Sequence, residues 1–280
     1  MSPPVHPGER SGCDVGDIDV GGIRHHYDVD GSGLPVVLVH GLGGRGDAVW
    51  RNVVPALARD VRVITYDLRG SGRSESPPGP YAMGDFSDDL VTLLDALGLG
   101  QAVLIGHSMG GSIALLTASR YPERVQAVVG VGAPLALSPE AQAGVRKRAE
   151  TVEAGGMREV AEAVGKAAFA PAFQEAHPAL VAEYVELVAA CDPSGYAAQC
   201  RALADLDLAG ELGRIRAPAV LVNGDVDYIA PSAAAEVAAG QIPRCERVVL
   251  PGCGHIVPWE RPDELVGAMR GVLSSLTEGR

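Results

Sequence analysis

The chain has 280 residues, 47% of them hydrophobic and 21% charged, which is typical of a globular protein with a sizeable core and excludes a disordered or fibrous chain. Its formal net charge of -12 argues against a nucleic acid partner, because affinity for a phosphate backbone depends on Lys and Arg. No stretch approaches the roughly 18 apolar residues of a membrane helix, and the N-terminal segment lacks the apolar region of a secretory signal, so we expect a cytoplasmic protein without a membrane partner.

Eight short runs rich in β-branched residues predict eight strands along the chain. Residues 1–16 precede them, are rich in Pro, Gly and charge, and are expected to form a mobile tail. Some runs, such as 35–39 and 103–105, are continuously apolar, as burial on both faces of a parallel sheet requires. The predicted strands are 17–20, 23–29, 36–40, 61–66, 102–105, 125–131, 219–222 and 247–250.

Helical patterns separate many of these strands. Leucines within 88–97 lie on one stripe that ends at Gly98, and a second helical pattern runs from Ser108 until Pro122 stops it. This alternation predicts an α/β fold with a mostly parallel eight-stranded sheet and helices on both faces. The active site of such a sheet lies at the carboxyl ends of its strands.

Residues 137–211 interrupt the alternation, because they contain no convincing strand pattern and are rich in Ala, Glu and Val. We expect helices here, inserted as a cap between the core segments 17–136 and 212–280. A cap of this kind closes over the strand ends and supplies the walls of a substrate site. The alternative is a helical satellite that only packs on the core.

The segment 106–110 reads Gly-His-Ser-Met-Gly and lies between a predicted strand and a predicted helix. That context is what a G-x-S-x-G nucleophile elbow requires. The sharp turn strains the serine backbone, and a side chain at Gly106 or Gly110 would collide with its neighbours. We therefore predict Ser108 as a nucleophile, the alternative being a surface serine in a glycine-rich turn.

A serine hydroxyl needs a base to take its proton and a third group to orient that base. His255 follows the last predicted strand, where a loop can bring its imidazole over Ser108. The acid comes after the strand at 219–222, where both Asp225 and Asp227 are available. Spacing favours Asp227 as the partner of His255, whereas Asp225 is nearer the strand end and suited to capping the turn.

A tetrahedral intermediate needs two backbone N–H donors for its oxyanion. Met109, directly after the nucleophile, supplies one, and Leu42, in the glycine-rich loop after the strand at 36–40, is the natural second donor. His40 is interpreted as a brace for that loop. The segment 67–74 lacks the Lys-Ser/Thr of a phosphate loop and is interpreted as a structural turn.

Five cysteines, an odd number without a C-x-x-C pair, indicate neither a disulfide framework nor a zinc site. Cys253 lies two residues before His255, and we interpret it as a small packed residue rather than a reactive thiol.

These motifs occur in the order of the α/β hydrolases, which the chain resembles over residues 20–275: His40-Gly41, the turn 67–74, the elbow 106–110, Asp227 and Gly254-His255. The segment 191–208 is similar to the cap of 3-oxoadipate enol-lactonases, and cofactor-free haloperoxidases and esterases are also similar. The resemblance implies hydrolysis of a small-molecule ester or lactone, such as an enol-lactone, through an acyl-enzyme on Ser108. It also implies that no metal or organic cofactor takes part.

The lactone of that family carries a carboxylate, so its pocket should present a cation. Arg201, in the segment 137–211, is the candidate to contact it, and Trp50 and Tyr196 are further candidate substrate-binding residues.

Several other functions stay open on the same three residues. A C–C bond hydrolase, an acyltransferase or a perhydrolase could use them, and a non-catalytic ligand-binding protein could retain them unused. Epoxide hydrolases and haloalkane dehalogenases of this fold use a carboxylate nucleophile, so Ser108 argues against both. Nothing in the sequence indicates an oligomeric state.

Overall fold

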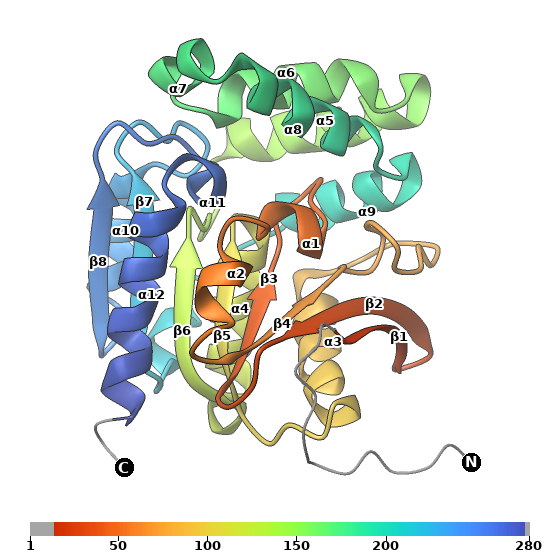
Figure 1. Ribbon diagram of the computed structural model, residues 1–280. Helices are drawn as coiled ribbons and strands as arrows, with labels where there is room; N and C mark the ends of the chain where they lie inside the picture. Colours follow the sequence, from red (N-terminus) through yellow and green to blue (C-terminus); the bar gives the residue numbers. More distant parts are fainter. Residues whose placement is uncertain (1–13, 278–280) are drawn as a thin grey trace.

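The computed structural model describes residues 14–277, in which eight strands form one sheet in the order β1-β2-β4-β3-β5-β6-β7-β8 (Figure 1). β2 is antiparallel to β1 and β4, and every other pair of neighbours is parallel, which confirms the mostly parallel sheet. The strands are β1 Asp14–Val20, β2 Ile23–Asp30, β3 Pro35–Val39, β4 Arg62–Tyr66, β5 Ala102–His107, β6 Val125–Val131, β7 Ala219–Gly224 and β8 Cys245–Leu250.

Strand β1 begins earlier than the sequence pattern indicates. Residues 1–13 of the expected tail lie outside the described residues, but Asp14, Val15 and Gly16 pair with β2, so the tail prediction was wrong for these three. They belong to an edge strand and are exposed or only half-buried. Because such a strand needs no apolar run, the pattern that marks buried strands is missing here.

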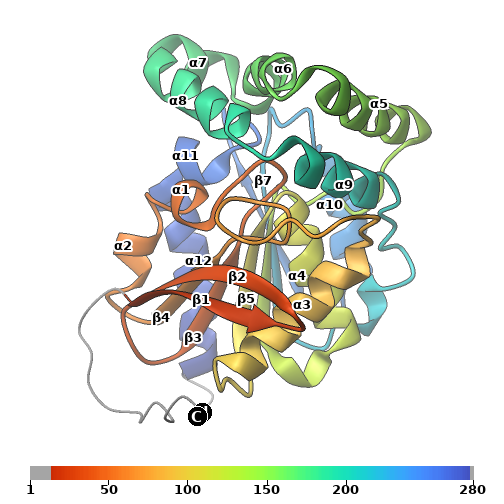
Figure 2. The same ribbon diagram turned by 90° about the vertical axis from the view of Figure 1, so that its right-hand side faces the viewer.

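Helices cover both faces of the sheet (Figures 1 and 2). Buried side chains of α3, α4 and α10 form one apolar core with the sheet, and those around α1, α2 and α12 form a second core on the opposite face. The helices of this part are α1 Gly46–Val49, α2 Val54–Leu57, α3 Met83–Ala96, α4 Met109–Arg120, α10 Ser232–Ala239, α11 Val257–Glu260 and α12 Pro262–Thr277, with 3-10 turns at Pro122–Arg124 and Leu212–Arg214.

Five further helices, which we call the cap, lie over the carboxyl ends of the strands (Figures 1 and 2). They fall within the expected segment 137–211, and a bridge between Ala136 and Asp207 joins its two ends. The cap has a core of its own, which also includes Ile256 and Trp259 from the segment after β8. Its status as a separate domain stays a prediction. The cap helices are α5 Pro139–Gly155, α6 Arg158–Ala168, α7 Pro171–Ala176, α8 Pro178–Ala189 and α9 Pro193–Ala204.

Within residues 14–277, no helix combines the length and the apolar character that crossing a membrane requires.

Candidate active site

Ser108 occupies a strained turn between β5 and α4. Its φ of 53° makes it the one non-glycine residue in 14–277 with a positive φ. A Cβ added to Gly106 would lie 2.0 Å from the carbonyl oxygen of Gly110, and one added to Gly110 would lie 2.3 Å from that of Val39. Only glycine fits at both positions, and the turn therefore presents the Ser108 hydroxyl at the carboxyl end of the sheet.

Ser108, His255 and Asp227 form a continuous hydrogen-bonded chain. His255 Nε2 lies 2.9 Å from Ser108 Oγ, and His255 Nδ1 lies 2.8 Å from Asp227 Oδ2. An ionised carboxylate only accepts, so Nδ1 carries the proton and Nε2 is the acceptor that faces the serine hydroxyl. This tautomer leaves His255 able to take the proton of Ser108.

Asp227 is held in its charged form. Burial raises the pKa of this carboxyl, but His255 and the backbone N–H groups of Ile229 and Ala230 outweigh that effect and lower its pKa below the ordinary value. Both N–H groups donate to Oδ1, at 2.8 and 2.9 Å. Asp225 instead accepts a hydrogen bond from Gly252 N at 2.7 Å, so it joins the loops after β7 and β8, whereas the sequence indicated a cap of its own turn.

Leu42 and Met109, the two predicted oxyanion donors, lie in the loop after β3 and in the first turn of α4. Met109 is the first residue of α4, and a first-turn N–H has no acceptor within its own helix. Leu42 lies in the loop after β3 and lines the same cavity as Ser108. Their role as oxyanion donors stays a prediction.

His40 holds the loop after β3 through two hydrogen bonds, as its interpretation as a brace predicts. Its Nδ1 donates to the carbonyl oxygen of Gly41 at 2.8 Å, and its Nε2 accepts from Leu68 N at 3.0 Å. Burial lowers the pKa of His40, which favours the neutral ring that both bonds require. The turn at 67–74 is likewise structural, because Asp67 accepts hydrogen bonds from Gly46 N and Arg73 N.

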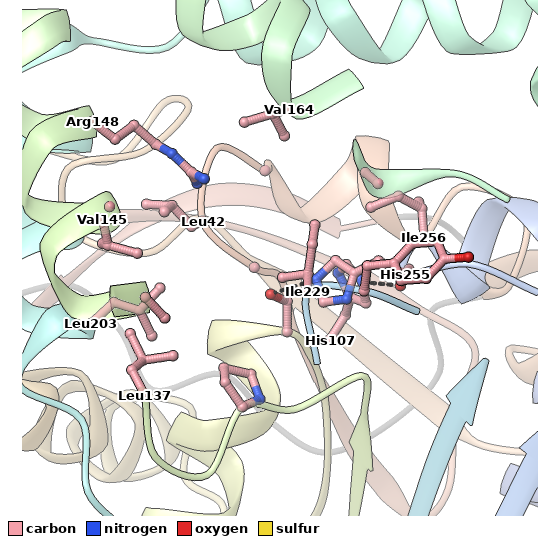
Figure 3. Close-up of a pocket in the computed structure, with 18 of the residues that line it drawn as sticks. Leu42, His107, Leu137, Val145, Arg148, Val164, Leu203, Ile229, His255 and Ile256 are labelled. Atoms are coloured by element: carbon pink, nitrogen blue, oxygen red, sulfur yellow. Dashed lines mark hydrogen bonds between the residues drawn. The ribbon is translucent and has the colours of Figure 1, made fainter. Parts of the chain in front are cut away.

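A cavity of about 320 Å³ lies between the sheet edge and the cap, with Ser108 and His255 in its wall (Figure 3). Most of the lining is apolar and comes from both the core and the cap: Leu42, Val49, Pro134, Leu137, Ala141, Val145, Val164, Ala168, Leu203, Ile229 and Ile256. A mostly apolar cavity with a few polar groups is the usual form of a small-molecule site.

Arg148 of α5 contributes a cation to this cavity, and Figure 3 shows its guanidinium pointing toward the interior past Leu42. Among the residues that the structure describes, Arg148 forms no ion pair with a carboxylate, and its neighbours include Tyr196 and Cys200. Burial lowers its pKa, but these neighbours more than offset that effect and raise it.

Two of the three predicted substrate-binding residues were wrong. Trp50 is fully buried in the core on the α12 face of the sheet and does not line the cavity. Arg201 lies on the outer side of α9 and forms a paired hydrogen bond with Glu153 of α5, at 2.6 and 2.8 Å. Tyr196, on the inner side of α9, does line the cavity.

Sequence reasoning missed Arg148, although a signal was present. On α5, Val145 lines the cavity and Ala149 and Val152 are buried, which defines the inward stripe of the helix. Arg148 follows Val145 by three positions and so faces the same way, whereas Arg146 forms an exposed ion pair with Asp205.

His107 is a second group that sequence reasoning missed. It is buried in the wall of the cavity, and its Nε2 donates to the backbone oxygen of His255 at 2.9 Å. Burial, reinforced by the neighbouring His255, lowers the pKa of His107 to about 3. It therefore stays neutral and does not exchange protons. Instead it supports residues 251–256, the loop between β8 and α11 that carries His255 and that we call the histidine loop.

A strained serine elbow, a histidine after the last strand and a helical cap define a class of protein, and the comparison with known families agrees. The model of the alpha/beta hydrolase fold family matches residues 35–262, so the chain belongs to this family and is a hydrolase.

The expected resemblance to enol-lactonases is also confirmed. The chain is 32% identical over 244 residues to 3-oxoadipate enol-lactonase 2 of Acinetobacter baylyi, covering 85% of this chain and 88% of the relative. The crystal structure of the enol-lactonase from Burkholderia xenovorans LB400 superposes with a TM-score of 0.88 at 30% identity, covering 92% and 100% of the two chains. A thermophilic esterase from Thermogutta terrifontis gives a TM-score of 0.88 at 31% identity, covering 94% and 99%.

Proposed function

We propose that the protein hydrolyses a carboxylic ester or lactone through an acyl-enzyme on Ser108. The observation that carries this proposal is the hydrogen-bonded chain from Ser108 through His255 to Asp227, set in the wall of an apolar cavity. A histidine with one ring nitrogen 2.9 Å from a serine hydroxyl and the other bonded to a carboxylate is the arrangement that activates a serine nucleophile.

In the first half of the reaction, His255 Nε2 takes the proton of Ser108 and Oγ attacks the carbonyl carbon. The N–H groups of Leu42 and Met109 stabilise the oxyanion. The intermediate then collapses, the bond to the leaving oxygen breaks, and that oxygen takes the proton from His255. In a lactone the leaving oxygen stays attached to the acyl chain.

In the second half, a water molecule replaces the leaving oxygen. His255 takes one proton of the water while its oxygen attacks the acyl carbon, and the bond to Ser108 Oγ then breaks. Ser108 recovers its proton from His255, and the carboxylic acid is released. Asp227 stays ionised throughout and stabilises the imidazolium that forms in each half.

The finer proposal is a substrate that carries a carboxylate as well as the ester or lactone, as 3-oxoadipate enol-lactone does. Arg148 supports it, because within residues 14–277 this cation has no carboxylate partner and it lines a mostly apolar cavity. The enol-lactonase names of the relatives support it independently. Arg148 thereby takes the part that the sequence assigned to Arg201.

The test combines a fluorophosphonate probe with a substrate panel. The intact mass should increase by one adduct on Ser108, and turnover should be fastest for an enol-lactone that carries a carboxylate, compared with p-nitrophenyl esters and a vinylogous diketone. Cleavage of the diketone with esters spared would instead indicate a C–C bond hydrolase. An adduct without turnover of any substrate would indicate a ligand-binding protein.

A further inference from the structure

Glu260, at the end of α11, is a buried carboxylate that the proposed reaction does not use. Glu260 is only 5% exposed, and within residues 14–277 it forms no ion pair. Its Oε2 accepts two backbone hydrogen bonds, from Gly254 N at 3.0 Å and from Ala170 N at 3.1 Å. One oxygen atom therefore joins the histidine loop of the core to the start of α7 in the cap.

A second hydrogen bond connects the same two segments. The backbone N–H of His255 donates to the carbonyl oxygen of Ala168 at 2.7 Å, next to the Glu260 contact. A Cβ on Gly254 would lie 2.5 Å from Ala170 N and 2.8 Å from Glu260 Oε1, so the two segments approach as closely as glycine allows. The cap thus contacts the backbone of His255 and of the residue before it.

Burying an unpaired carboxylate is unfavourable, and burial raises the pKa of Glu260 despite its backbone donors. An apolar side chain would avoid this cost, but it could not accept the two N–H groups, and each would be left buried without a partner. Charge-assisted bonds to backbone N–H groups are strong and directional. The carboxylate therefore fixes the position of the loop rather than merely filling space.

The position of this loop sets the two contacts of the His255 ring. Nδ1 of the ring lies 2.8 Å from Asp227 and Nε2 lies 2.9 Å from Ser108. The backbone of His255 is held at two points: its oxygen accepts from the His107 ring, and its N–H donates to the oxygen of Ala168. A small displacement of the loop would lengthen both ring contacts at once. Misplacement of reacting groups by about 1 Å can lower a rate by about a hundredfold.

We propose that Glu260 is a positioning residue that fixes His255 against the cap, so that the cap controls catalysis as well as substrate binding. This inference rests on the proposed function of His255. The cap segment 168–170 thus has two roles: Ala168 lines the cavity, and the segment supports His255, the general base.

The test compares Glu260→Met, which removes both acceptors, with Glu260→Gln, whose amide oxygen can still accept both N–H groups. For a small p-nitrophenyl ester, Glu260→Met should lower kcat about tenfold to a hundredfold, with KM within about twofold of wild type. Glu260→Gln should recover most of the lost kcat. An unchanged kcat in Glu260→Met, or a kcat in Glu260→Gln as low as that of Glu260→Met, would overturn the proposal.

Gln199→Met is the matched control, because the buried Gln199 of α9 donates to Arg69 O at 2.7 Å and to Ser71 Oγ at 2.8 Å and so also links cap and core, but through the turn 67–74 and not through the histidine loop. It should leave kcat unchanged, and a loss equal to that of Glu260→Met would show that any weakened cap contact suffices.

Should Glu260→Met fail to fold, Ala170→Pro interrupts the same connection from the cap side. Ala170 has a φ of -58° and Phe169 a ψ of 149°, both suited to a proline at 170, which has no N–H to donate. It should give the same loss of kcat at nearly constant KM, and a kcat equal to wild type would overturn the proposal. Turnover by Ser108→Ala, in contrast, would refute the proposed function itself.

Discussion

The carboxylate of Asp227 lies 2.8 Å from Nδ1 of His255 and faces away from solvent, while Asp225, two residues earlier, bonds to Gly252 N. The two acids of this loop therefore have different structural partners. One orients the imidazole, and the other connects the loops after β7 and β8.

Asp227→Asn should lower kcat by about 10⁴-fold, by analogy with other triads, because an amide can turn its NH₂ toward Nδ1 and hold the wrong tautomer of His255. Steady-state kinetics on a p-nitrophenyl ester would measure the loss. Asp225→Asn is the control, and a larger loss in that variant would make Asp225 the acid.

Ser108→Ala should abolish turnover and labelling by the fluorophosphonate while leaving the thermal unfolding temperature nearly unchanged. The hydroxyl makes one part-buried hydrogen bond, so the folded state loses little when it is removed. Activity above about a tenth of wild type would refute Ser108 as the nucleophile, since loss of a triad nucleophile costs far more than that.

Arg148→Met should raise KM about tenfold to a hundredfold for an ester that carries a second carboxylate, because a hydrogen bond to a charged group contributes about 1.5–3 kcal/mol. KM for the matching neutral methyl ester should change little. Arg146→Met, which removes an exposed cation of the same helix, is the matched control. Equal increases in KM for both esters would indicate that Arg148 only supports the cavity wall.

His107 should make the stability of the protein depend on acid pH. Its folded pKa of about 3 lies below the ordinary value of 6.5, so below pH 6.5 the unfolded chain takes up a proton that the folded protein does not. Its contribution is fully present above pH 6.5 and is lost as the pH falls toward 3, with a slope of up to about 1.4 kcal/mol per pH unit.

Urea unfolding between pH 4 and 7 would measure this slope in wild type and in His107→Gln, whose amide can still donate to the backbone oxygen of His255. The variant should show a shallower decline, although His40, whose pKa burial also lowers, continues to contribute. Identical slopes in wild type and His107→Gln would contradict the assignment to His107.

Much of the fold and the hydrogen-bonded chain at the site could be predicted from the sequence because their signals are local. Continuously apolar runs indicate buried parallel strands. Gly106 and Gly110 indicate the sharp strand-to-helix turn at Ser108, because that turn leaves no room for a Cβ at either position. The loops that carry Asp227 and His255 follow strands, and parallel strands bring their carboxyl ends to one edge.

The substrate wall was harder to predict, because it depends on how cap helices pack against one another. The stripe of Val145, Ala149 and Val152 marks the side of α5 on which Arg148 lies, but the packing of α5 against α9 decides that this side faces the cavity while Arg201 pairs with Glu153. Trp50 directly follows the short helix α1. Its burial depends on how α1 packs over the second core, which the local sequence does not indicate.

The shared core of Ile256 and Trp259 with the cap also bears on how substrate reaches the site. Lifting the cap away as a unit would expose both side chains to water, at a cost of about 1.5–3 kcal/mol for each large apolar group. Tyr228 and Ile229 line the same cavity yet are 76% and 40% exposed, so the loop that carries them forms its mouth. Substrate and product therefore have a route past these two side chains that leaves the contact of Ile256 and Trp259 with the cap intact.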